Sequence, residues 1–237
     1  MQNDPLNTAL APIDSLDALN QVMIQCTRCP RLVAWREEVA RTKRRAFRDW
    51  EYWGRPVPGF GDPHARLYIL GLAPAAHGGN RTGRSFTGDS SGNFLYNALY
   101  KAGFANQPTS VSRDDGLRLL DVYIGAAARC APPGNKPTTD ELTNCRPYVM
   151  AELRLLNNLQ GIVALGAIGF AAILAAFRQM GHDIPPLKFG HGVLYSLGEG
   201  LPWLMGSYHP SQQNTQTGRL TPGDFDAIWT KARERLA

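Results

Sequence analysis

The chain has 237 residues, 43% of them hydrophobic, and carries a formal net charge of +5. This length suits one large domain, which buries enough surface to fold without disulfides or structural metals. The longest apolar stretch, residues 161–177, is too short and too interrupted by glycine for a membrane span. The N-terminus lacks the basic and then apolar pattern of a secretory signal, so we expect a cytoplasmic protein.

Helical patterns and short apolar runs alternate along the chain. Two helices are expected at residues 15–26 and 30–47, on either side of a Cys-x-x-Cys turn. The apolar runs that follow are bounded by turn residues and predict buried strands. The predicted strands cover residues 66–70, 121–127, 161–165 and 203–207, and the later helices cover residues 91–103, 139–159, 167–180 and 224–236.

Strands that alternate with helices are typical of βαβ units. The sequence therefore predicts an α/β fold, a three-layer α/β/α single domain with a central, mostly parallel four-stranded sheet. In such sheets ligands bind beyond the carboxyl ends of the strands. Three loops with unusual chemistry follow predicted strands, at residues 71–90, 128–138 and 208–219. We expect the functional site where these loops meet.

The densest basic segment is residues 41–48, Arg-Thr-Lys-Arg-Arg-Ala-Phe-Arg, and Trp50, Tyr52 and Trp53 follow it. One interpretation is a solvated helix end. The other is a contact with a phosphate backbone or the rim of a metal cluster. The net positive charge mildly favours a polyanionic partner.

Four cysteines are present, and they are Cys26, Cys29, Cys130 and Cys145. Structural disulfides are not expected in a cytoplasmic chain. Four thiolates, two of them preorganised on a tight turn, can hold either tetrahedral zinc or a [4Fe–4S] cluster. The spacing does not separate these two groups, and four unrelated buried thiols are a further alternative.

The loop at residues 71–90 is rich in glycine, which lets a ligand approach the backbone closely. Residues 78–85 resemble a phosphate-binding loop, but Arg84 stands where the nucleotide-binding lysine should be. The segment also lies too far beyond the strand, which argues against a nucleotide hydrolase. Asp89 precedes a predicted helix, so it can cap that helix and can also turn a carboxylate toward a reacting carbon.

The other two loops each contain one polar residue with suitable chemistry. His209 follows a predicted strand and precedes Pro210, which aims it at the crevice beyond the sheet. The alternative is that His209 only forms a structural hydrogen bond. Asn135 lies in a loop that three prolines stiffen, and its donor and acceptor faces suit a base edge, although asparagine is common in turns.

Three groups of residues are similar to the motifs of a known family. Gly71-Leu72-Ala73-Pro74, then residues 77–84, then Phe86-Thr87-Gly88-Asp89 resemble the first active-site motif of family 5 uracil-DNA glycosylases. His209-Pro210-Ser211, with residues 214–219, resembles the second motif, and the four cysteines are similar to the cluster ligands. The resemblance runs from about residue 22 to the C-terminus. It implies one glycosylase-like domain over residues 1–237, with residues 1–20 as an N-terminal extension.

The resemblance implies a base-excision DNA repair enzyme that hydrolyses the N-glycosidic bond of uracil in DNA and leaves an abasic site. It also implies a [4Fe–4S] cluster, bound by the four cysteines, with a structural or DNA-orienting role. The implied partner is double-stranded DNA or, as a second candidate, single-stranded DNA. We expect a monomer with no membrane partner.

The resemblance further implies roles for individual residues. Asp89 would be the catalytic carboxylate, His209 the electrophilic stabiliser, and Asn135 a group near the base or the attacking water. The implied substrate-binding residues are Gly71, Ala73, Ala75, Asn80, Phe86 and Asn214. Other uracil glycosylases carry an acid or amide where Ala75 and Ala76 stand, and such an apolar wall does not reject larger bases. We therefore expect hypoxanthine and other deaminated bases as additional substrates.

Two functions from other classes remain open at this point. A non-catalytic nucleic-acid-binding module with a structural metal would bind DNA without forming an abasic product. The clustering of Asp89, Asn135 and His209 at predicted strand ends counts against it. A hydrolase of nucleosides or small glycosides would turn over free uridine or deoxyuridine, and the positive net charge mildly disfavours it.

Overall fold

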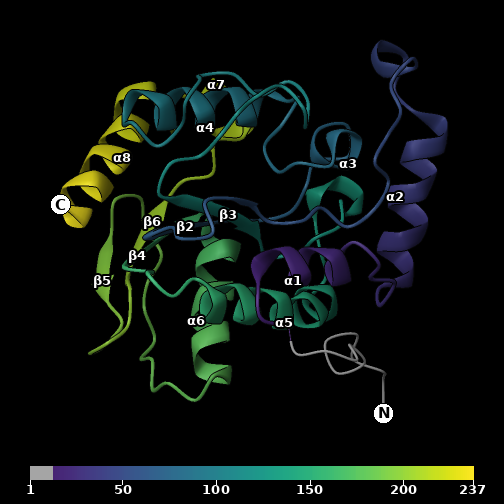
Figure 1. Ribbon diagram of the computed structural model, residues 1–237. Coiled ribbons are helices and arrows are strands. Elements are labelled where there is room, and N and C mark those ends of the chain that lie inside the picture. Colours follow the sequence, from purple (N-terminus) through teal and green to yellow (C-terminus); the bar gives the residue numbers. More distant parts are fainter. Residues whose placement is uncertain (1–12) are drawn as a thin grey trace.

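A central sheet lies between two layers of helices in the computed structural model, which describes residues 13–237 (Figure 1). The strand order is β1-β3-β2-β4-β6-β5. The four strands in the middle run parallel to one another. They are β2 (Leu67–Gly71), β3 (Val122–Ala126), β4 (Gly161–Leu165) and β6 (Trp203–Ser207). These are the four predicted strands, and the predicted three-layer α/β/α class is confirmed.

Two short edge strands extend the sheet from the predicted four strands to six. β1 (Phe60–Gly61) pairs antiparallel with β3, and β5 (Leu194–Ser196) pairs antiparallel with β6. Both are only partly buried and span two or three residues. Neither has the apolar run by which a buried strand is recognised, because an edge strand buries less of its surface.

The side chains of β2 join the sheet to the helical layers on both of its faces. Tyr68 and Leu70 point into one apolar core, and Leu67 and Ile69 point into the other, as expected from the two-residue period of a strand. Both cores are closed by helices, so the central strands are buried on both faces. One helical layer contains α1 (Leu16–Met23), α5 (Thr139–Leu155) and α6 (Ala167–Gln179), and the other contains α4 (Ser90–Lys101) and α8 (Pro222–Leu236).

The N-terminal part of the chain contributes to the core. Residues 1–12 of the predicted extension lie outside the described residues. Within residues 13–20, however, Leu16 and Leu19 of α1 are buried against α5. Between residues 13 and 237, none of the helices combines the length and apolar character needed to cross a bilayer.

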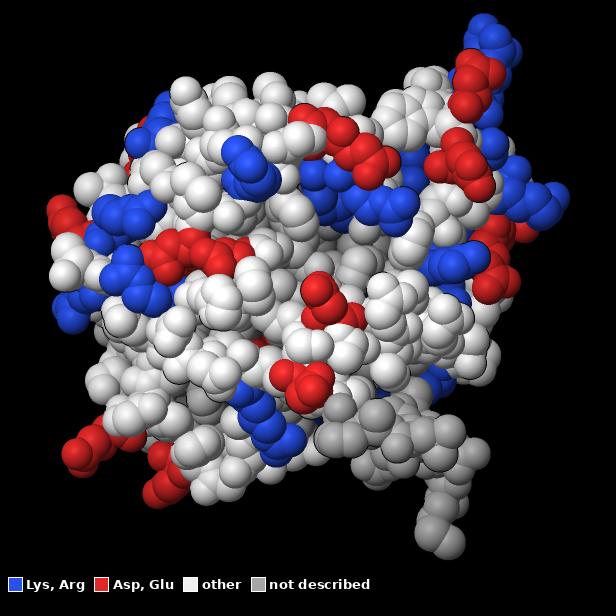
Figure 2. Space-filling view, viewed as in Figure 1, with Lys and Arg blue, Asp and Glu red and all other residues white. Residues whose placement is uncertain are grey.

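The basic run belongs to a projecting turn, where the structure differs from the predicted helix over residues 30–47. Helix α2 (Pro30–Thr42) ends before Lys43, whose φ of 53° does not continue a helix, and a short turn η1 (Arg45–Phe47) follows. The arginines at 41, 44, 45 and 48 are exposed. Figure 2 shows basic side chains at this tip beside acidic ones, and Arg41 pairs with Glu38 at 2.5 Å.

Candidate active site

A cleft of about 550 Å³ opens at the carboxyl ends of the parallel strands. Gly71 ends β2, Ala126 ends β3, and His209 lies two residues beyond β6. All three line the cleft, so the loops meet where the fold class predicted. Of the predicted site residues, those that line it are Gly71, Ala73, Ala75, Phe86, Asp89, Asn135 and His209.

Asp89 both caps a helix and lines the cleft. It is the N-cap of α4, and its Oδ1 accepts a hydrogen bond from the Gly92 amide at 2.9 Å. Its other oxygen lies against Gly78, where a Cβ would approach Oδ2 to 2.0 Å, so only glycine fits beside it. Burial raises the pKa of the Asp89 carboxyl. The cap fixes one carboxylate oxygen while the residue still lines the cleft.

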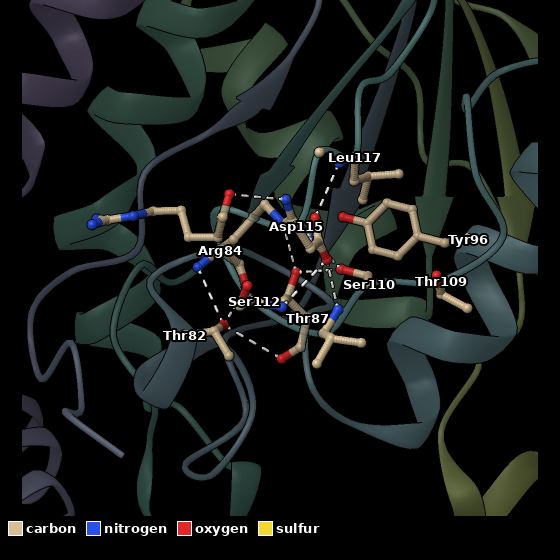
Figure 3. A network of polar contacts seen from close by, with 12 residues as sticks. Thr82, Arg84, Thr87, Tyr96, Thr109, Ser110, Ser112, Asp115 and Leu117 are labelled. Atoms are coloured by element: carbon tan, nitrogen blue, oxygen red, sulfur yellow. Dashed lines mark hydrogen bonds and ion pairs between the residues drawn. The ribbon is translucent and has the colours of Figure 1, made fainter.

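The turn that carries Asp89 is fixed by the buried guanidinium of Arg84 (Figure 3). Nη2 of Arg84 donates to both carboxylate oxygens of Asp115, at 2.9 and 2.8 Å, and to the Ser110 hydroxyl at 2.9 Å. Nε donates to the Thr87 hydroxyl at 2.9 Å, and the Gly88 amide donates to the Ser110 carbonyl at 3.0 Å. Arg84 is therefore a structural anchor for this loop.

Phe86 is held in a left-handed backbone conformation with a φ of 54°. Its ring lies against the end of β2, since a Cβ on Gly71 would come within 2.9 Å of that ring. The preceding carbonyl, that of Ser85, accepts a hydrogen bond from the buried Tyr96 hydroxyl at 2.9 Å. This arrangement keeps an aromatic face at the end of the sheet, where a planar ring can stack.

His209 packs beside Phe86 in the wall of the cleft, with ring centroids 5.7 Å apart. Desolvation lowers the pKa of His209 to about 4, so the imidazole is neutral at physiological pH. Asn214 donates from Nδ2 to the His209 carbonyl at 2.8 Å. Asn214 itself is not among the residues that line the cleft, so its contact is with the histidine backbone.

Asn135 reaches the cleft from the turn η2 (Pro133–Asn135), with a φ of 56°. Lys136 beside it also lines the cleft, as do Gln212 and Gln213 after His209, and none of these three is among the predicted site residues. Lys136 directly follows Asn135 and Gln213 directly precedes Asn214, so adjacency to a predicted site residue was the available signal for these two. Lys136 is a cation at the mouth of a site expected to take a polyanion.

Asn80 is placed elsewhere than expected. It lies in the short helix α3 (Gly79–Thr82), is fully buried and does not line the cleft. Its Nδ2 donates to the Arg36 carbonyl at 3.1 Å, which joins the loop after β2 to helix α2. The residue therefore braces the loop, because its side chain points into protein and not toward the cleft.

The four cysteines are free and line one small cavity, together with Arg36, Arg129 and Tyr148. Arg36 donates from Nη1 to Cys130 Sγ at 2.9 Å, and Asn144 donates from Nδ2 to Cys29 Sγ at 3.4 Å. Burial raises the pKa of Cys130 to about 11 and that of Cys145 to about 12. In the described part of the chain, no group of three or more His, Cys, Asp or Glu residues is arranged to hold a metal ion.

The cysteine region is joined to the cleft. Arg31, two residues after Cys29, donates from Nη2 to the Lys136 carbonyl at 3.1 Å. The same guanidinium binds both oxygens of Glu141, at 2.8 and 2.7 Å, and Glu141 forms the capping box of α5 with Thr138. Helix α2 thus braces the loop that carries Asn135.

Aromatic residues at the end of the basic run and just after it also contact the loop after β2. The Arg81 guanidinium lies 4.0 Å from the ring centroids of both Phe47 and Trp50. Arg81 also donates to the Gly88 carbonyl at 2.9 Å, one residue before Asp89. The basic tip and the cleft are therefore connected through one side chain.

Comparison with known proteins agrees with this architecture. A model of the Uracil DNA glycosylase superfamily matches residues 58–233. The chain is 55% identical over 221 residues to a type-5 uracil-DNA glycosylase of Mycobacterium bovis, which covers 93% of this chain and 81% of that protein. It is 53% identical over 223 residues to the type-5 enzyme of Thermus thermophilus, covering 93% and 98% of the two chains. The type-5 enzyme of Pyrobaculum aerophilum is 46% identical over 199 residues, 84% of each chain. The chain therefore belongs to the uracil DNA glycosylase superfamily.

Proposed function

We propose that this protein is a uracil-DNA glycosylase of base excision repair, which hydrolyses the bond between uracil and its sugar in DNA. The observation that carries the proposal is the meeting of Asp89, Phe86 and His209 in one cleft at the strand ends. Identities of 46–55% to type-5 uracil-DNA glycosylases over most of the chain support it. DNA is accordingly the substrate. The monomeric state and the cytoplasmic location remain predictions.

The cleft residues divide the chemistry of bond breaking between the base and the sugar. The damaged nucleotide is flipped out of the duplex, at a lower cost when it is mispaired, and its base stacks on Phe86 near the Ala73 backbone. As the glycosidic bond stretches, negative charge builds on the base, and neutral His209 donates a hydrogen bond to it. Asp89 stabilises the positive sugar or orients the attacking water.

The range of bases follows from the wall of the cleft at Ala75. A methyl group there forms no hydrogen bond that a larger base would fail to satisfy. We infer that hypoxanthine is also excised, with Asn135 available to contact the base edge from the opposite loop.

Four cysteines around one cavity support a further part of the proposal, a [4Fe–4S] cluster held by Cys26, Cys29, Cys130 and Cys145. The donor set fits, because thiolates are the ligands of such clusters and Arg36 already donates to one sulfur. When bound, the cluster would cross-link α2, the loop after β3 and α5. Its role would be structural. By fixing α2 it would also fix the loop that contains Asn135, because Arg31 of α2 binds the Lys136 carbonyl in that loop.

The function is tested with end-labelled DNA duplexes that contain one uracil or one hypoxanthine, followed by alkaline cleavage. We expect strand cleavage at uracil and, more slowly, at hypoxanthine. DNA binding without cleavage of either would indicate the binding module, and release of uracil from free deoxyuridine alone would indicate a nucleoside hydrolase.

Replacement of Asp89 separates its catalytic role from its cap. Asp89→Asn keeps an oxygen that can accept from the Gly92 amide, so we expect little loss of stability but a single-turnover rate about 10²–10³-fold lower. Asp89→Ala should also lose about 1 kcal/mol of stability. Thr221→Ala, which removes the cap of α8, is the matched control and should lose stability without losing rate. A near-wild-type rate for Asp89→Asn would remove the carboxylate from the mechanism.

The low pKa of His209 predicts a dependence of stability on pH. The unfolded chain takes up a proton on this residue near pH 6.5, whereas the folded chain does so only near pH 4. Stability should therefore fall as the pH is lowered from about 7 to about 4, and His209→Gln should weaken this fall. NMR titration of the His209 ring measures the pKa directly, and a value at or above 6.5 would contradict a neutral donor.

If the four cysteines hold a [4Fe–4S] cluster, the protein should be coloured and should contain iron. Protein purified without oxygen should absorb broadly in the visible range and contain about four irons per chain. Cys145→Ser should lower the iron content and weaken the visible band. Stoichiometric zinc without iron in the wild-type protein would show that the cysteines form a different site.

A further inference from the structure

We propose that His191, which lies outside the cleft, is a positioning residue that holds the backbone on the N-terminal side of His209. The inference rests on the proposed function, because His209 is the group that is positioned. Nδ1 of His191 accepts a hydrogen bond from the backbone amide of Tyr208 at 3.1 Å. Tyr208 directly precedes His209, so this bond fixes the peptide from which the cleft histidine projects.

Aromatic packing holds the His191 ring at this amide. The rings of His191 and Tyr208 are stacked, with centroids 5.1 Å apart and planes inclined by 22°. The guanidinium of Arg219 lies 4.4 Å from the centroid of the same tyrosine ring. Stacking on Tyr208 limits the rotation of the imidazole, which keeps Nδ1 directed at the amide.

The chain brings His191 to this place through a close approach of two backbones. The Gly192 amide donates to the Gly206 carbonyl at 2.8 Å, and the Gly206 amide donates to the Val193 carbonyl at 3.0 Å. A Cβ on Gly206 would lie 2.5 Å from the Gly190 carbonyl oxygen, so a larger residue would push this segment away. Gly206, the penultimate residue of β6, thus permits the contact that places His191.

Support on both sides matters because His209 lies beyond the regular part of the sheet. β6 ends at Ser207, so the Tyr208 amide is outside the ladder, and His191 supplies its acceptor. On the other side, Asn214 donates to the His209 carbonyl at 2.8 Å. A catalytic group has to be held within about 0.5 Å of its productive position, and a displacement of about 1 Å can cost about 10²-fold in rate.

Two substitutions separate the acceptor of His191 from its ring. His191→Asn places an amide oxygen close to the position of Nδ1, so it retains an acceptor without the ring. His191→Phe retains a ring that can stack on Tyr208 but has no acceptor. We expect His191→Phe to lower the single-turnover rate on uracil-containing DNA about 10-fold, and His191→Asn to recover most of that loss.

Three further measurements distinguish positioning from a general structural role. Hydrogen exchange of the Tyr208 amide should accelerate in His191→Phe but not in His191→Asn. The dissociation constant for uracil-containing DNA and the urea unfolding midpoint should stay close to the wild-type values in both variants. His182→Phe is the matched control, since His182 also packs on an aromatic ring, Phe177, at 5.7 Å, and its rate should be unchanged.

The outcomes keep this inference separate from the proposed function. An active wild type with an equally active His191→Phe variant, or with both variants equally slow, overturns the role of His191 and leaves the glycosylase intact. Unchanged exchange of the Tyr208 amide in His191→Phe also overturns it. A wild type that excises neither base overturns the proposed function and the positioning role together.

Discussion

The buried ion pair between Arg84 and Asp115 is the interaction on which the cleft depends. The chain between β2 and α4 contains only the short helix α3, so regular structure does little to fix it. A buried guanidinium without partners is strongly destabilising, often by several kcal/mol, so the buried Arg84 requires the acceptors that surround it. Its acceptors are Thr87, which precedes α4, and Ser110 and Asp115, which follow α4, so Arg84 ties the segment after α4 to the turn that carries Asp89. The position of that carboxylate thus rests on a contact outside the cleft.

The middle of the fold could be predicted because burial leaves a strong pattern in sequence. β4 and β6 have the predicted bounds, since each is a buried run between turn residues. The edge strand β1 could not be predicted, because its two residues lie in a segment rich in turn formers. Helix α2 ends five residues early for a local reason, the positive φ of Lys43, which hydrophobic periodicity does not report.

The site could be predicted as a set of loops, but the direction of each side chain could not. Asn80 and Asn214 lie in the correct loops, yet one is buried against α2 and the other binds the His209 backbone. The side-chain amide of asparagine has the same donors and acceptors at both positions, so only tertiary contacts decide whether it binds the backbone or faces the cleft. His191 could not be selected at all, since its partner lies 17 residues away and the contact depends on the pairing of β5 with β6.

The neutral state of His209 has a consequence for turnover. Once the glycosidic bond breaks, the base is an anion in a desolvated cleft, where an adjacent imidazolium would form a strong ion pair with it. Such a pair would stabilise the departing base but would also retain the product. In the proposed mechanism a neutral donor provides a hydrogen bond without the full charge, and the base leaves after taking up the proton that the attacking water releases. In the proposed mechanism, burial of the His209 ring therefore limits both the stabilisation of the departing base and its retention after bond breaking.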